Sequence, residues 1–444
     1  MKILKILVII MITTQAVANI ATAKEIKYYE ETLDNGLEVI YCIDKSAPII
    51  ASALHYKVGS KDELAKKSGY AHFFEHLMFE ATDNIPRAEI PKYVNEAGGS
   101  LNAHTSFDET VYQFKLPANQ IKLALWIESQ RMRGLHIEKV GVDTQRGVVM
   151  EEKKARVDNQ PYGTMLEKMT ENMFGTGTYG WTTIGKFEDL EAAKISDFQS
   201  FYNNFYRPDN AILSICGDFK LSEMKQLVRD YMADIKGSAK MKRPQYNISE
   251  LKKEYRETVE DEKAQIPVMF IGFRIPPMTD PDYYAVNLLT SIMASGQSSR
   301  LHKSIVDEQE IAQFVGLNPL ALELSGVALF IAAAKMGGKE EELAGIEKEI
   351  YKSMQEVIED GVSDSELEKT RNIIEADLVY SKKNVLSKAM QLARYKAYFG
   401  DASLMNTEID KYNAVTKADL QRVAKKYFDT DKRVVLNYIP KINK

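Results

Sequence analysis

The chain has 444 residues, of which 45% are hydrophobic and 27% charged, and its formal net charge is -5. This composition is typical of a globular protein and excludes an extended disordered chain, while the length predicts at least two packed domains. Acidic and basic residues are mixed along the chain, so no basic cluster indicates a nucleic-acid partner.

The first 23 residues have the layout of a secretory signal peptide. Two early lysines precede an apolar run over residues 6–12, and Ala21 and Ala23 provide small residues for cleavage. A membrane-spanning helix needs about 20 uninterrupted apolar residues, and this run ends at Thr13. We therefore expect cleavage after Ala23, no stable membrane anchor and a periplasmic location. Full secretion would give the same signal, and an uncleaved anchor is the alternative.

The mature chain begins with a mixed pattern of strands and helices, which predicts an α+β fold. The predicted elements are strands over residues 37–41, 49–56, 111–116 and 211–215, and a helix over residues 120–134. The two cysteines, Cys42 and Cys216, fall in apolar strand-like stretches and are too few for a structural zinc site. We expect buried free thiols, with a disulfide in an oxidising compartment as the alternative.

A candidate metal motif follows the second strand, in the segment SGYAHFFEHLMFE. His72 and His76 are four residues apart, so a helix places both imidazoles on one face, as two ligands of one metal require. Glu75 reverses the order of the H-E-x-x-H motif and lies beside the metal, where a general base is needed. The alternative is a surface helix with ordinary i to i+4 pairs, which the apolar neighbours of the motif disfavour.

The two histidines require one more donor, because catalytic zinc takes three protein ligands and keeps a position open. Glu151 and Glu152, in GVVMEEKKARVDNQ, fit a helical stretch that could lie against the first helix. A set of two histidines and one glutamate suits one Zn²⁺ per chain, although cobalt or manganese would also be tolerated. A lone histidine in a strand is more often structural, so contact of His104 with substrate or metal is the less favoured alternative.

The second half of the chain repeats the first. Residues 197–209 precede the strand at 211–215 as residues 419–431 precede a strand at 434–438, at a constant offset of 222 (419 minus 197). The strand that starts after Pro48 matches the one after Pro267 at an offset of 219 (267 minus 48). These matches predict two copies of one α+β unit.

A polar stretch with Gly237, Ser238 and Pro244 separates the two copies and predicts a linker. The predicted organisation is a signal peptide (1–23), an N-terminal domain with the metal motif (24–235), a linker (236–250) and a homologous C-terminal domain without that motif (251–444).

The motifs together resemble those of the pitrilysin-type metallopeptidases, the family of the mitochondrial processing peptidase, insulin-degrading enzyme and many bacterial two-domain peptidases. The matching segments are H-x-x-E-H at 72–76, Gly-Gly-x-x-Asn-Ala-x-Thr at 98–105, Val-Val-x-Glu-Glu at 148–152, Phe-Tyr-x-x-x-Tyr-x-Pro at 201–208 and Ser-Ser-Arg-Leu at 298–301. The resemblance implies two homologous α/β-sandwich domains of the pitrilysin and processing-peptidase type.

The same resemblance implies roles for individual residues. Glu152 becomes the third metal ligand, with Glu151 as its neighbour. The segment 99–105 becomes an edge strand to which a substrate peptide adds as a further strand. Gly99, Asn102 and Ala103 then bind substrate, with Asn102 and Ala103 near the scissile bond.

This sequence departs from the family pattern at two places. Many relatives carry a glutamate that orients the site where this chain has Gln145, and an amide keeps hydrogen bonding but carries no charge. Relatives also carry an arginine and a tyrosine seven residues apart in the second domain, where this chain has Val306 and Gln313. The resemblance therefore implies a homologous partner subunit that supplies this pair, or otherwise a homodimer.

The sequence thus predicts a zinc-dependent endopeptidase that hydrolyses peptides or unfolded polypeptides in the cell envelope as the metal-bearing subunit of a heterodimer. Glu75 would deprotonate the attacking water and return the proton to the leaving amine. The alternative is a non-catalytic or weakly active scaffold or maturation subunit, which the intact Glu75 disfavours.

Overall fold

The computed structural model describes residues 25–236 and 241–441. The predicted signal peptide (1–23) lies outside the described residues. Among the helices that are described, none combines the length and the apolar character needed to cross a membrane.

The N-terminal half forms a mixed six-stranded sheet in the order β1-β2-β6-β3-β5-β4. Its strands are β1 (Tyr28–Thr32), β2 (Glu38–Ile43), β3 (Ile49–Tyr56), β4 (Ser100–Thr105), β5 (Thr110–Pro117) and β6 (Ala211–Gly217). The pair β2 and β6 is parallel, and the other pairs are antiparallel. The four predicted strands are confirmed, with bounds that differ by at most two residues.

The helices of the N-terminal half lie between its strands or after the last of them. They are α2 (Tyr70–Leu77), α3 (Ile90–Glu96), α4 (Ile121–Arg133), α5 (Lys139–Lys153), α6 (Met165–Phe174), α7 (Phe187–Ala192), α8 (Ile195–Phe205) and α9 (Leu221–Met232). The predicted helix over residues 120–134 is confirmed as α4. A large core cluster joins β3, β5 and β6 to α2, α4 and α8.

The C-terminal half forms a five-stranded sheet in the order β7-β11-β8-β10-β9. Its strands are β7 (Tyr255–Asp261), β8 (Val268–Ile275), β9 (Ala312–Ala321), β10 (Gly326–Ala334) and β11 (Arg433–Pro440). Its helices are α10 (Asp282–Ala294), α11 (Glu340–Asp360), α12 (Asp364–Ser381), α13 (Val385–Phe399), α14 (Leu404–Ala414) and α15 (Lys417–Tyr427). The fold is therefore α+β with two α/β domains, as predicted.

The two sheets have the same strand order once β1 is set aside. The order β2-β6-β3-β5-β4 corresponds strand by strand to β7-β11-β8-β10-β9, and the pairs β2–β6 and β7–β11 are both parallel. The helix before each parallel strand also repeats, because α8 starts at Ile195 and α15 at Lys417, an offset of 222 (417 minus 195). The internal repeat predicted from sequence is thus present in the fold.

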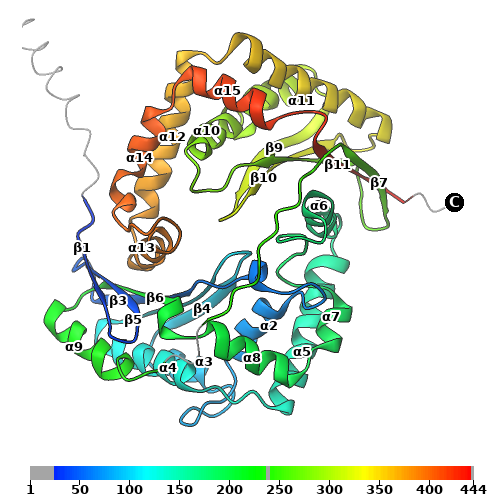
Figure 1. Cartoon of the computed structure of the whole chain (residues 1–444). Helices are drawn as coiled ribbons and strands as arrows, with labels where there is room; N and C mark the ends of the chain where they lie inside the picture. Colours follow the sequence, from blue (N-terminus) through cyan, green and yellow to red (C-terminus); the bar gives the residue numbers. More distant parts are fainter. Residues whose placement is uncertain (1–24, 237–240, 442–444) are drawn as a thin grey trace, which may run out of the picture.

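Each half contributes a helix to the face of the other half's sheet that is turned toward it, so α13 and α6 lie between the two sheets (Figure 1). Helix α13 packs on β2, β3 and β6, where Ala389, Leu392 and Ala393 are buried against Ile40 and Cys216. Helix α6 packs in the same way on β8, β10 and β11 of the C-terminal sheet. Both sheets are therefore covered on both faces, which accounts for the nearly continuous apolar strands β6 and β8.

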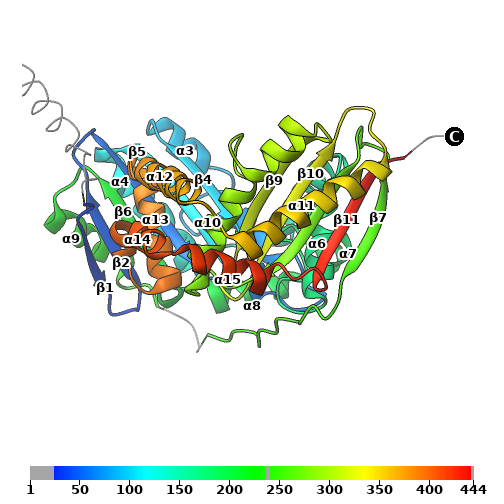
Figure 2. The ribbon, with the colours of Figure 1, turned by 90° about the horizontal axis from the view of Figure 1, so that it is seen from above.

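Residues 241–250, the described part of the predicted linker apart from residue 236, cross the outside of the molecule as an extended chain, as the view from above shows (Figure 2). The described residues 241–250 form neither helix nor strand. Arg243 fixes this segment to the N-terminal half, because its guanidinium lies 2.7 Å from Asp62 Oδ1 and donates to Asn210. Cys42 and Cys216 are buried free thiols in register on β2 and β6.

Replacing Leu392 tests the contact between α13 and the N-terminal sheet. We expect Leu392→Ala to lower the free energy of unfolding by about 2–5 kcal/mol, because the side chain is fully buried and its loss leaves a cavity. Leu64→Ala is the control, since Leu64 is 56% exposed and its loss should change stability by less than about 0.5 kcal/mol. Urea denaturation followed by circular dichroism measures both; equal midpoints would contradict the prediction.

Candidate metal centre

The helix that carries the metal motif, α2, has a well-defined start. Gly69 precedes it in the left-handed region, at a φ of 84°. The buried carboxylate of Glu63 accepts hydrogen bonds from the backbone N–H of Gly69 (2.9 Å) and of Ala71 (2.7 Å), and from Trp181 Nε1 (2.8 Å). The first N–H groups of a helix have no partner within the helix, and Glu63 accepts hydrogen bonds from two of them, so Glu63 fixes where α2 begins.

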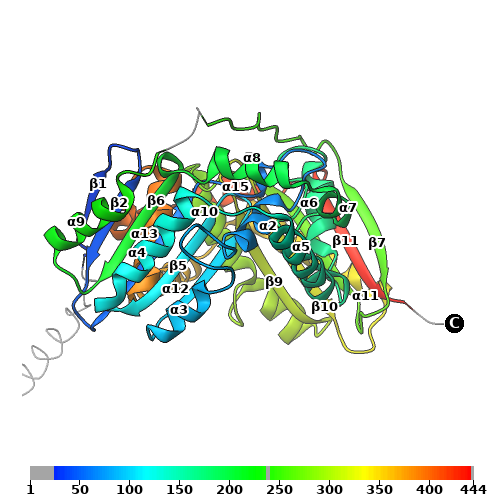
Figure 3. The ribbon, with the colours of Figure 1, turned by 90° about the horizontal axis from the view of Figure 1, so that it is seen from below.

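Aromatic packing decides which face of α2 points to the metal site. Phe73 and Phe74 are fully buried. The ring centroid of Phe73 lies 4.4 Å from that of Phe198, and the ring centroid of Phe74 lies 5.9 Å from that of Phe201; both partners are on α8. The polar positions of the helix are left on the side of α5. The view from below shows α2 and α5 next to each other (Figure 3).

The three predicted ligands meet between these two helices. Glu152 Oε2 lies 3.6 Å from His72 Nε2 and 3.4 Å from His76 Nε2. One ligand atom from each of the three residues falls within 4.8 Å of the others. The structure thus brings the predicted glutamate on α5 together with the histidine pair, in a group that could hold a metal ion.

The choice between the two neighbouring glutamates is clear from their surroundings. Glu151 is 72% exposed at its side chain and pairs with Lys154 at 2.6 Å. Glu152 is mostly buried, and its second oxygen, Oε1, lies 2.6 Å from Arg156 Nη1. Arg156 belongs to a short π-helix (Lys154–Asp158) that follows α5 directly. Glu152 thus turns one oxygen to the histidines while Arg156 holds the other.

The protonation state of His72 fits a metal ligand. Burial, together with the charges of His76 and Arg156, lowers the pKa of His72 to about 3. The imidazole is therefore neutral near pH 7 and has a lone pair to offer. With a second imidazole and a carboxylate in reach, the donor set is the one that catalytic zinc sites use.

Glu75 lies on the same side of α2 and is held by a neighbouring strand. The hydroxyl of Thr105, the last residue of β4, donates a hydrogen bond of 2.5 Å to Glu75 Oε2. Burial raises the pKa of Glu75, while the bond from Thr105 and the charge of His76 act in the opposite direction. A carboxyl group with a raised pKa beside a metal site suits proton transfer near neutral pH.

The segment predicted to bind substrate is an edge strand. β4 pairs with β5 on one side only and ends the N-terminal sheet. Asn102 is exposed, and Ala103 packs partly on the core. A Cβ added to Gly99 would lie 2.2 Å from Leu116 Cδ2 and 2.9 Å from the backbone oxygen of Lys115, so close packing against β5 by itself favours glycine there.

Two further residues named in the sequence analysis, Gln145 and His104, make their contacts away from the three metal-binding residues. Gln145 Nε2 donates to Glu80 Oε1 at 2.8 Å, so it joins α5 to the segment that follows α2. The described contacts of Gln145 include none to the three ligands. His104 lies 3.5 Å from Glu109 Oε1 and takes no part in the cluster of metal-binding residues.

The sequence analysis did not predict two contacts at the site, that of Arg156 with Glu152 and that of Thr105 with Glu75. Arg156 lies four residues after Glu152, and this spacing on a helix could have indicated the pair. Thr105 lies in a motif that the sequence displays, but nothing in the sequence says that its hydroxyl reaches Glu75. That contact depends on how the sheet edge packs beside α2.

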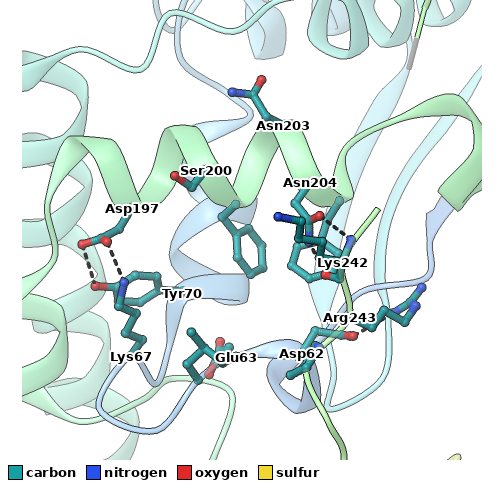
Figure 4. Close-up of a pocket in the computed structure, with 14 residues that line it drawn as sticks. Asp62, Glu63, Lys67, Tyr70, Asp197, Ser200, Asn203, Asn204, Lys242 and Arg243 are labelled. Atoms are coloured by element: carbon teal, nitrogen blue, oxygen red, sulfur yellow. Dashed lines mark hydrogen bonds and ion pairs between the residues drawn. The ribbon is translucent and has the colours of Figure 1, made fainter. Parts of the chain in front are cut away.

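A cavity of about 540 Å³ lies elsewhere, between α8, the segment before α2 and the linker (Figure 4). Two ion pairs line it: Lys67 lies 2.6 Å from Asp197, and Arg243 lies 2.7 Å from Asp62. Phe201 and Phe205 line its apolar part. The three metal-binding side chains are not among its lining residues.

Two protein-family models match the chain. One, described as insulinase (peptidase family M16), covers residues 38–186, and the other, described as the peptidase M16 inactive domain, covers residues 193–374. The first includes the metal cluster and the second lies mostly in the C-terminal half. The chain belongs to the M16 peptidase family.

Other M16 proteins match nearly the whole chain. Zinc protease PqqE of Helicobacter pylori is 28% identical over 413 residues, which cover 92% of both chains. The uncharacterized zinc protease YmxG of Bacillus subtilis is 22% identical and covers 91% of this chain and 97% of its own. The crystal structure of a protease from Helicobacter pylori matches with a TM-score of 0.87 and 27% identity, over 94% of this chain and all of that one. Pitrilysin shares the fold over 47% of its length, with a TM-score of 0.78.

Glutamine substitutions at the two adjacent glutamates of this M16 protein test which one binds metal. We expect Glu152→Gln to lose most of its zinc, because an amide is a weaker ligand than a carboxylate. Glu151→Gln should keep one zinc per chain, since Glu151 is exposed and pairs with Lys154. Elemental analysis after dialysis measures the zinc content, and zinc loss in the Glu151 variant alone would contradict the assignment.

Proposed function

We propose that this chain is a zinc-dependent endopeptidase that hydrolyses peptides or unfolded polypeptides in the cell envelope. The observation that carries the proposal is the placement of Glu75 beside the joined set of His72, His76 and Glu152. The naming of similar M16 proteins as zinc proteases supports the same metal and reaction class.

The three ligands would hold the metal, which when bound supplies Lewis acidity to the attacking water and the scissile carbonyl. Glu75 takes the proton from the attacking water at a carboxylate oxygen and returns it to the leaving amine. The hydroxyl of Thr105 keeps the carboxylate turned toward the site. Arg156 holds the free oxygen of Glu152, so that one oxygen remains directed at the imidazoles.

The exposed edge of β4 supports a peptide substrate. A substrate strand that adds to β4 would be held by main-chain hydrogen bonds, which recognise extended chains with little regard to sequence. Gly99, Asn102 and Ala103 would then lie along the bound peptide. Folded proteins lack a free extended segment, so peptides and unfolded chains are the substrate class that this edge favours.

The partner subunit remains part of the proposal. Val306, in a short π-helix (His302–Glu308), and Gln313, on β9, stand where relatives are expected to carry an arginine and a tyrosine. Neither side chain can replace a charged donor. A homologous subunit would provide the pair, and a homodimer is the alternative. The cell-envelope location rests on the N-terminal signal sequence alone.

Glu75→Gln separates the proposed peptidase from a non-catalytic scaffold. We expect the variant to keep one zinc per chain, because the ligands are unchanged, and to lose roughly 10²- to 10⁴-fold in peptide hydrolysis, since it lacks the general base. Hydrolysis of a mixed library of quenched fluorescent peptides measures the rate. Equal rates for wild type and variant would argue against Glu75 as the base, and zinc binding without cleavage by either would favour the scaffold or an absent partner.

Purification from the native source tests the partner. We expect a homologous subunit with an Arg and Tyr pair to co-purify, and the mature chain alone to cleave the library more slowly than the complex. Size-exclusion chromatography with light scattering gives the stoichiometry. A chain that purifies alone with full activity would contradict the heterodimer and would leave Arg156 as the cation next to the metal in its own chain.

A further inference from the structure

The hairpin of β4 and β5 joins the candidate base to the C-terminal half. Its first strand ends at Thr105, whose hydroxyl reaches Glu75. Its turn carries two consecutive acidic residues, Asp108 and Glu109, and both contact the other half of the chain. One short segment therefore touches the base at one end and the second domain at its turn.

Asp108 is buried, and both oxygens of its carboxylate have polar partners. Its Oδ1 accepts from the hydroxyl of Tyr179 at 2.6 Å and lies 3.3 Å from Lys61 Nζ. Its Oδ2 accepts from the backbone N–H of Glu323, in the turn between β9 and β10, at 2.9 Å. The side chain of Glu323 in turn pairs with Lys61. An unpaired buried charge would be costly, so this arrangement holds the hairpin turn against the C-terminal sheet.

Glu109 forms the second connection. Its Oε2 accepts a hydrogen bond of 2.8 Å from the hydroxyl of Tyr398 on α13, and lies 3.5 Å from His55 Nδ1. Burial acts to raise the pKa of Glu109, but His104, His55, Arg394 and Tyr398 outweigh it and lower the pKa to about 2. Glu109 is therefore anionic near neutral pH and strongly held by its partners in both halves.

We propose that Thr105 is a positioning residue for Glu75, and that the C-terminal half keeps it in place by holding the hairpin turn through Asp108 and Glu109. This inference rests on the proposed function. A threonine hydroxyl can donate to the ionised carboxylate and accept from the protonated one, so it can hold Glu75 before and after proton transfer. The domain without a metal motif then has a role in catalysis, although no residue of it needs to touch substrate.

Two substitutions at one position test the first part. We expect Thr105→Val to lower kcat roughly ten- to one-hundredfold, as for the loss of one hydrogen bond to a charged group, with KM and zinc content near those of wild type. Thr105→Ser keeps the hydroxyl and should recover most of the rate. A valine variant as fast as wild type, or a serine variant as slow as the valine variant, would overturn the role of the hydroxyl.

The hold by the second domain is tested by Tyr398→Phe, which removes only the hydroxyl on Glu109. The matched control is Tyr395→Phe, on the same helix, where the hydroxyl lost is bonded to Glu408 within the C-terminal half. Hydrogen–deuterium exchange of the zinc-loaded chain over residues 100–117 should become faster in the first variant only. Equal exchange rates over these residues in the two variants would overturn the proposal that the C-terminal half holds the hairpin turn.

Failure of the proposed function would look different. A wild-type chain that cleaves no peptide, alone or with its partner, would refute the proposed peptidase function. The exchange experiment would still show whether the C-terminal half holds the hairpin turn. A crystal structure of the Thr105→Val variant then decides the contact with Glu75: the carboxylate should turn away from β4, and an unchanged carboxylate would overturn the inference.

Discussion

The packing of one face of α2 into an aromatic core is the interaction on which the site depends. Phe73, Phe74 and Leu77 are buried to 1% exposure or less, and their burial fixes the rotation of the helix. His72, Glu75 and His76 must then face α5 and the edge of the sheet. Each buried aromatic or leucine side chain contributes about 1.5–3 kcal/mol, so the three together strongly favour this orientation of the helix.

The relation between the two halves adds a second constraint. Helices α6 and α13 each cover the sheet of the other half, so neither sheet has a complete apolar cover from its own half. The N-terminal half holds the metal-binding residues, and the C-terminal half secures the hairpin that reaches Glu75. Duplication thus gave two copies of one unit that diverged in chemistry while each remained necessary for packing the other.

The arrangement at Glu152 shows how charge is distributed around the site. Its two oxygens have different neighbours, with imidazoles on one side and Arg156 on the other. Gln145 carries no charge and donates to Glu80 rather than to any of the three ligands. Arg156 is 75% exposed, so an exposed cation lies directly beside the carboxylate that faces the histidines.

The sequence by itself determined the local features. The spacing of His72 and His76, the reversed order that includes Glu75, the strands and the internal repeat all follow from short-range patterns, because periodicity and side-chain chemistry are properties of neighbouring residues. The family resemblance selected Glu152 over Glu151, which spacing alone left open. Only the tertiary structure decided which distant groups meet: Thr105 with Glu75, Asp108 with the β9–β10 turn and Glu109 with Tyr398. These contacts join segments up to 289 residues apart, and their formation depends on how the sheets and the exchanged helices pack, which no local pattern encodes.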